Sequence, residues 1–174
     1  MAAHSFISSR AAVIHDLTDD HMVLSWERCV GVVWKRETTV AGVAKTEKVF
    51  RELYQRHSSG LYLMTIVEEG ALMPNAEARE TVAVFLRSVA GKLRMSAVVH
   101  EGSGFRAAAV RSVVTGLSML VRLPYPHEIF ATVEQAAKWL STSKFKDVDA
   151  DYTVLAVSHA RRTADNSQLK FRGQ

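Results

Sequence analysis

Two nearly continuous apolar segments, residues 61–67 and 95–99, constrain the fold of this chain more than any other feature. Runs of this kind suit strands that are buried on both faces, as in a parallel sheet. Segments with helical periodicity alternate with them along the chain. Short strand–helix–strand connections force parallel pairing through right-handed crossovers. The pattern therefore predicts an α/β domain.

Three short segments before the first apolar run predict an antiparallel β-meander. They cover residues 11–17, 21–27 and 30–35, and the last places its valines and Trp34 on one face with the period of a strand. The turn chemistry of Thr18-Asp19-Asp20 separates the first two. The last two segments are either separate strands or one bent strand.

Four helices are expected after the meander. Their capping residues are Thr38 or Thr39, Asn75, and Thr132, which forms a capping box with Gln135, while Gly60 suits the left-handed end of the first helix. The helices are expected over residues 39–57, from 75 with an apolar stripe reaching Leu93, from 105 to about 120, and from 132 to 140. A short last strand is expected over 128–131.

The predicted fold is thus an N-terminal β-meander followed by β-α-β-α-β-α, with helices packed on a mixed, mostly parallel sheet. This domain is expected to span residues 10–142. Residues 143–174 form a C-terminal extension in which 151–160 suit either a helix or a strand. From Arg161 onward the chain is polar, and we expect a frayed basic tail.

Composition and charge bound the protein class. Hydrophobic residues make up 48% and charged residues 23% of the 174 positions, which is typical of a globular protein with its own core. Cys29, the single cysteine, lies in an apolar segment, so we expect a buried thiol in a reducing cytoplasm. No secretory signal or transmembrane segment is expected. A net charge of +4 is too small to imply nucleic-acid binding.

Two segments resemble a known family. The stretch from Pro126 through the Ala-x-Trp-Leu ending at Leu140, and Glu101-Gly102-Ser103-Gly104-Phe105-Arg106, are similar to parts of STAS-type domains, especially the bacterial SpoIIAA-like group. The fold of that group is akin to the lipid-binding CRAL-TRIO domain. The resemblance covers the region from Arg10 to about Ser141. It implies a non-enzymatic bacterial regulator that binds other proteins.

The resemblance does not extend to the phosphorylation switch of that family. Its best-known members carry a phosphorylatable serine where the helix after the central strand begins. Here residues 69–76 read Glu-Gly-Ala-Leu-Met-Pro-Asn-Ala, without serine or threonine. We therefore expect a regulator that works without this switch.

One modest candidate site lies in the loop Gly102, Ser103, Gly104 and Arg106. Backbone amides beside glycines and at a helix N-terminus can hold a phosphate or a carboxylate, which Arg106 would reinforce. Gly102-x-Gly104-x-x-Ala107 also matches a relaxed dinucleotide fingerprint, but that motif belongs to the first strand–helix unit of its fold. A tight turn is the simpler explanation of both glycines.

Other candidate chemistry is weaker. The glycines directly flank Ser103, so the spacing of a nucleophile elbow is absent. His100 and His127 are expected at opposite ends of neighbouring strands, and the other histidines are scattered, so we expect neither a metal site nor a cofactor. The carboxylates suit a solvated loop and a helix N-terminus; these are Glu68, Glu69, Glu77 and Glu80.

We therefore expect a protein-interaction module with another protein as its partner and no enzymatic activity. A carrier of a small ligand, anion or lipid with a CRAL-TRIO-like fold is the alternative. The small residues of 107–109 and Gly116 also leave a homodimer open, because they allow close approach of a second chain.

Overall fold

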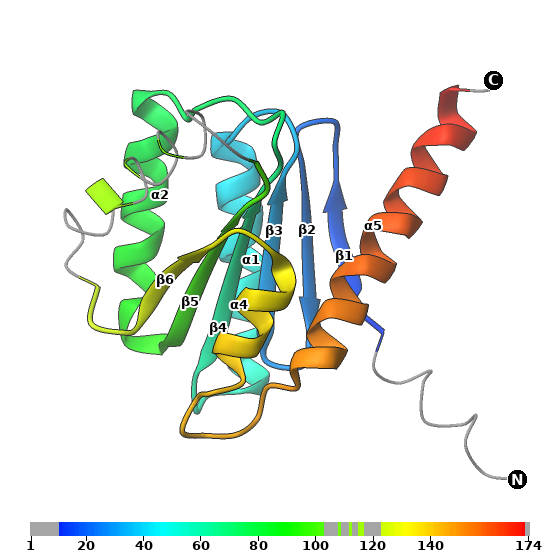
Figure 1. Cartoon of the computed structure of the whole chain (residues 1–174). Helices are drawn as coiled ribbons and strands as arrows, with labels where there is room; N and C mark the ends of the chain where they lie inside the picture. Colours follow the sequence, from blue (N-terminus) through cyan, green and yellow to red (C-terminus); the bar gives the residue numbers. More distant parts are fainter. Residues whose placement is uncertain (1–10, 103–107, 109–111, 113–114, 117–122, 173–174) are drawn as a thin grey trace, which may run out of the picture.

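The computed structural model describes residues 11–102, 108, 112, 115–116 and 123–172, within which six strands form one mixed sheet (Figure 1). They lie side by side in chain order; β1 to β3 pair antiparallel, and β3 to β6 pair parallel. The strands are β1 (Val13–Leu17), β2 (His21–Trp26), β3 (Cys29–Trp34), β4 (Leu61–Val67), β5 (Leu93–His100) and β6 (His127–Phe130). The predicted α/β fold is confirmed, and the second and third strands are separate.

Helices cover both faces of this sheet. One face carries α1 (Val40–Arg56) and α2 (Ala76–Val89), and the other carries α4 (Val133–Leu140) and α5 (Ala150–Arg172). Alternate residues of each strand point to opposite faces, so the sheet divides the core into two clusters. The predicted third helix, 105 to about 120, lies mostly outside the described residues.

The capping residues predicted at the helix ends are found in the structure. Thr39 Oγ1 accepts a hydrogen bond from Gly42 N (3.1 Å), and Asn75 Oδ1 accepts one from Ala78 N (2.8 Å). Gly60 ends the connection after α1 with φ of +119°, a left-handed conformation that glycine adopts without steric cost. These local signals are short in range, which is why the sequence alone identifies them.

Several element boundaries differ from the prediction, and the last strand covers His127–Phe130 instead of residues 128–131. The second helix ends at Val89, and a 3₁₀ turn over Ala90–Lys92 leads directly into β5. Leu93 is therefore a buried strand residue and not part of the helical stripe. Gly91 explains the early end, since glycine is a poor residue for a helix interior.

Of the two alternatives for residues 151–160, the structure has the helix, but the expectation of a short element followed by a frayed tail from Arg161 was wrong. Helix α5 runs from Ala150 to Arg172 and packs on the same core as α4. Trp26 Nε1 donates a hydrogen bond to Thr153 Oγ1 (3.1 Å), which fastens the helix to β2. Its buried positions are Thr153, Ala156, Val157, Ala160 and Ala164.

An ionic network holds the loop between α4 and α5 against the sheet. The Tyr62 hydroxyl donates to Asp147 Oδ1 (2.6 Å), Arg94 binds Asp147 Oδ2, and Arg28 Nε lies 3.2 Å from the same oxygen. The Arg94 guanidinium also stacks on the Phe145 ring at 3.6 Å. Burial alone would raise the pKa of Asp147, but the hydrogen bonds and the two cations outweigh it and lower that pKa.

Candidate functional site

The carboxyl ends of the parallel strands open onto a polar cleft of about 690 Å³. Loops that follow β4, β5 and β6 meet there, and α5 forms one wall. In open α/β sheets this edge is where ligands bind. The polar cleft is lined by Glu68, Glu69, Gly70, Glu101, Gly102, Ala131, Thr132, Val133, Glu134, Val157, Ser158 and Arg161.

Arg161 is the cation among these lining residues. Its two terminal nitrogens each donate to one oxygen of Glu101, both at 2.8 Å, and Glu68 lies 3.6 Å away. Burial raises the pKa of Glu68; Arg161 opposes this and Glu101 adds to it. This bidentate pair occupies both terminal nitrogens of the guanidinium group. Arg161 therefore joins α5 to the loops after β4 and β5 and offers little positive charge to an incoming ligand.

The predicted anion site falls at this edge, but the structure describes only one of its four residues. Gly102 lines the polar cleft, and its N–H donates to the His100 carbonyl (3.1 Å). A Cβ at this position would lie 2.8 Å from His100 Cε1, so a larger residue would force the His100 ring to shift, and packing accounts for the glycine without a ligand. Ser103, Gly104 and Arg106 lie outside the described residues. Nearby Glu69 and Glu101 would repel an anion at Gly102.

Side chains at the start of α4 satisfy two backbone amides beside the polar cleft. Thr132 Oγ1 accepts from Gln135 N (3.2 Å), as the predicted capping box requires. The Gln135 side chain turns back and accepts from Ala131 N (3.2 Å), one residue before the expected partner. Glu134 occupies the first turn, where a carboxylate interacts favourably with the helix dipole.

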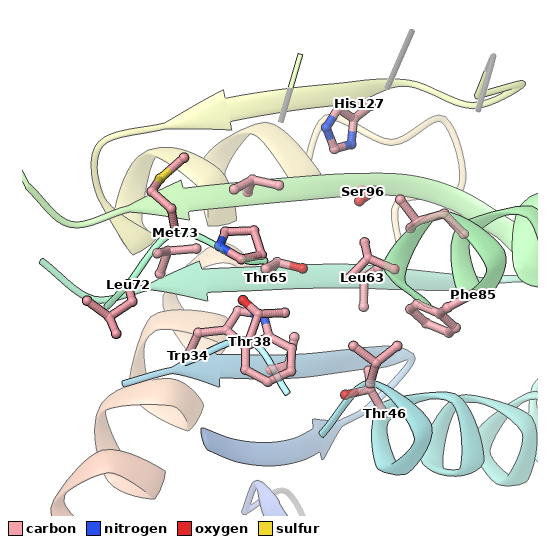
Figure 2. A pocket seen from close by; sticks show the side chains of 17 residues that line it. Trp34, Thr38, Thr46, Leu63, Thr65, Leu72, Met73, Phe85, Ser96 and His127 are labelled. Atoms are coloured by element: carbon pink, nitrogen blue, oxygen red, sulfur yellow. The ribbon is translucent and has the colours of Figure 1, made fainter. Parts of the chain in front are cut away.

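A second hollow, the apolar cavity, lies on the opposite face between the sheet and helices α1 and α2 (Figure 2). Its volume is about 110 Å³. Its described lining contains no Asp, Glu, Lys or Arg. The lining residues are Val32, Trp34, Thr38, Val43, Thr46, Leu63, Thr65, Val67, Leu72, Met73, Pro74, Val82, Phe85, Leu86, Ser96, Val98 and His127.

His127 supplies the imidazole of the apolar cavity. It begins β6 and pairs in register with Ser96. His100 lies at the other end of the parallel pair, as the last residue of β5. The expectation that the two histidines stay apart is therefore confirmed. Both ring nitrogens of His127 are buried and have no hydrogen-bond partner within the described part of the chain. Burial lowers the pKa of His127, which favours the neutral imidazole.

The loop between β4 and α2, residues 68–75, lies between the two hollows. Its first residues line the polar cleft, and Leu72, Met73 and Pro74 line the apolar cavity. Leu72 and Met73 are 55% and 42% exposed. Backbone bonds hold the loop in place, because Ala71 N donates to the Glu68 carbonyl (3.0 Å) and Leu72 N donates to the Arg36 carbonyl (2.6 Å).

Sequence reasoning missed the apolar cavity and the exposed Leu72–Met73 pair. The pair did leave a signal, since Ala71, Leu72 and Met73 form a run of three apolar residues in a predicted loop, and such runs are unusual unless they are functional. His127 was weighed only as a metal ligand. The cavity left no signal, because an internal volume depends on how distant segments pack.

No family model matches the sequence, and neither a curated protein nor a solved structure matches it. Within the described ranges, no helix has the length and apolar character needed to cross a membrane. The same residues contain no cluster of three or more His, Cys, Asp or Glu side chains with a geometry that suits a metal ion.

Proposed function

We propose that this protein is a non-catalytic interaction module that binds another protein through the loop between β4 and α2. The observation that carries the proposal is the exposure of Leu72 and Met73, side by side, on a loop held by backbone hydrogen bonds. This is the same loop in which STAS-type regulators, which the sequence resembles, carry their regulatory serine.

The energetics favour an interface at this loop. Complete burial of such a side chain is worth roughly 1.5–3 kcal/mol, and about half of this remains to be gained at Leu72 and Met73, which are 55% and 42% exposed. Other large hydrophobics are exposed in the described chain, but only these two are neighbours in sequence. Leu72 and Met73 lie on a loop that is already ordered, so they can bury their side chains in a partner's pocket with little loss of backbone entropy. A few such buried side chains can supply most of the binding free energy of an interface.

The charge around the loop specifies the chemistry of the partner. Glu68 and Glu69 begin the loop, Glu77 lies in the first turn of α2, and Glu101 faces the same cleft. Arg161 is already committed to Glu101 and Glu68. Arg36 and Arg79 hydrogen-bond to the rest of the loop, so this acidic character is confined to the side that faces the polar cleft. We therefore expect a partner surface with an apolar contact and with Lys or Arg on that side, because complementary charge speeds association and selects among partners.

Regulation through a phosphoserine in this loop is not part of the proposal. Residues 69–76 contain no hydroxyl side chain that a kinase could modify. The proposed module therefore binds its partner without the charge change that phosphorylation would introduce.

The size of the apolar cavity weighs against the alternative of a lipid carrier. Sites for drug-sized ligands typically occupy about 300–1,000 Å³, and the cavity here is about 110 Å³. An acyl chain needs more room than this cavity offers. The polar cleft is larger, but its acidic lining would repel anionic headgroups.

Site-specific photo-cross-linking in the native cell tests the proposal. A photoreactive amino acid at position 72 should give a discrete adduct with one protein, and the same group at position 84 should not. Val84 is a matched control because it is 51% exposed on α2 but lies outside both hollows. Equal adducts at both positions, or none at position 72, would overturn the proposal.

A further inference from the structure

We propose that the apolar cavity binds a compact, neutral, ring-sized molecule that carries one hydroxyl or carbonyl group hydrogen-bonded to His127. This inference goes beyond the interaction with a partner protein, and it concerns the chain alone. Figure 2 shows the cavity bounded by the sheet on one side and by Phe85 and Thr46 from the two helices on the other.

The volume sets the size of the ligand. An engineered apolar cavity of about 150 Å³ holds a benzene molecule, and the cavity here is about 110 Å³. The cavity is smaller than that benchmark but is not closed, because the half-exposed Leu72 and Met73 form part of its lining. One six-membered ring, with a small substituent directed towards the open side, is therefore the upper limit. The wall residues that determine this limit are Val43, Leu63, Val82, Phe85 and Val98.

The lining also sets the charge of the ligand. The described lining contains no Asp, Glu, Lys or Arg. Its one histidine, His127, has a lowered pKa, which favours the neutral imidazole. An ion would lose its hydration without gaining a counter-charge, which is strongly unfavourable. The ligand is therefore neutral.

His127 supplies the polar contact. A neutral imidazole has one N–H donor and one acceptor nitrogen, and neither finds a partner among the described residues. Thr46 also lines the cavity, but its hydroxyl already donates to the Gly42 carbonyl (2.8 Å). Buried polar groups in folded proteins are nearly always paired, and an unpaired one points to a missing water or ligand. A hydroxyl or carbonyl on the ring would pair with the imidazole.

Binding of phenol and benzene to the purified full chain tests this proposal. The two probes share a ring, and only phenol can hydrogen-bond His127. Dissociation constants come from titrations followed by amide chemical shifts, which also show whether the perturbed residues line the cavity. We expect phenol to bind about tenfold more tightly than benzene, as one added hydrogen bond allows. Failure of both probes to bind, or equal affinity for both, would overturn the proposal.

Three variants sharpen the test. His127→Phe keeps a planar ring and removes both nitrogens, so the preference for phenol should fall to within about twofold. Val82→Phe places a larger side chain in the cavity and should abolish binding of both probes, whereas Val84→Phe should change neither affinity. Chemical-shift dispersion verifies the fold of each variant. Retained preference in His127→Phe, or unchanged binding in a folded Val82→Phe, would contradict the assignment.

Discussion

Burial governs the protonation of several side chains, and the clearest case is Cys29. Its thiol is buried in the core next to the sheet, and burial raises its pKa, so it stays protonated. A protonated, inaccessible thiol is a weak nucleophile. The expectation of a buried cysteine is confirmed, and it followed from the apolar neighbours of Cys29 alone. The lowered pKa of His127 has the same cause but no such local signal.

Replacing His127 should change how stability depends on pH. A buried neutral histidine whose pKa is lowered must take up a proton when the chain unfolds in mild acid. The free energy of unfolding of the native protein should therefore fall as pH drops below about 6.5, the ordinary pKa of histidine. Urea unfolding between pH 5 and 8 should show a smaller fall in His127→Phe. His15 and His57, whose pKa values are also lowered, remain in both proteins.

That result would be contradicted by identical pH dependence in the two proteins. A control is Val84→Phe, which also introduces a phenyl ring but lies at an exposed position outside both hollows and removes no titratable group. It should leave the pH dependence unchanged.

The elements were predicted well wherever a local signal specified them. The helix caps at Thr39 and Asn75 and the left-handed Gly60 were all found where the sequence placed them. For α5 the sequence left helix and strand open and did not show the length of the helix, because the buried stripe consists mainly of alanines such as Ala156, Ala160 and Ala164. Small residues give a weak hydrophobic periodicity, so the face they bury is defined by contacts with distant strands.

Charge placed in the buried face of α5 should unfold the protein more readily. Ala160 is 1% exposed, so Ala160→Asp puts an unpaired carboxylate in the core. We expect a loss of about 3 kcal/mol or more in the free energy of unfolding. Arg162→Asp lies on the exposed side and should cost less than about 0.5 kcal/mol. Equal effects in denaturant titrations would mean that α5 does not pack on the core.

The ionic network around Asp147 should stabilise the fold by holding the loop between α4 and α5 against the sheet. Asp147→Asn leaves Arg94 without its charged partner and should cost about 1–3 kcal/mol at neutral pH. Because the pKa of Asp147 is lowered by folding, its contribution exists above the ordinary carboxyl pKa and is lost as pH falls through the lowered value. The difference from wild type should therefore shrink in acid. Asp151→Asn, on an exposed position, serves as control.

A constant difference across the acidic range would contradict the ionic account of the Asp147 network. It would instead indicate that the side chain acts through its shape and neutral hydrogen bonds. The measurement is urea unfolding of both variants from neutral pH to about pH 3.

At the scale of the whole molecule, the two faces of the sheet are filled differently. Helices α4 and α5 close over one face, and α1 and α2 leave the apolar cavity over the other. That helices pack on a mostly parallel sheet could be predicted, because strands and helices alternate in the sequence. The cavity is a small residual volume between segments far apart in the chain, so no local pattern records it. The exposed Leu72–Met73 pair lies on the loop that separates this cavity from the polar cleft.

The most direct test of the proposed interaction measures how tightly this chain binds the partner protein that is captured by photo-cross-linking at position 72. Calorimetric titration should show that Leu72→Ser with Met73→Ser weakens its binding by at least about tenfold, or 1.4 kcal/mol. Val84→Ser should bind as the native protein does. Unchanged affinity in the double variant, with its fold intact, would contradict the account.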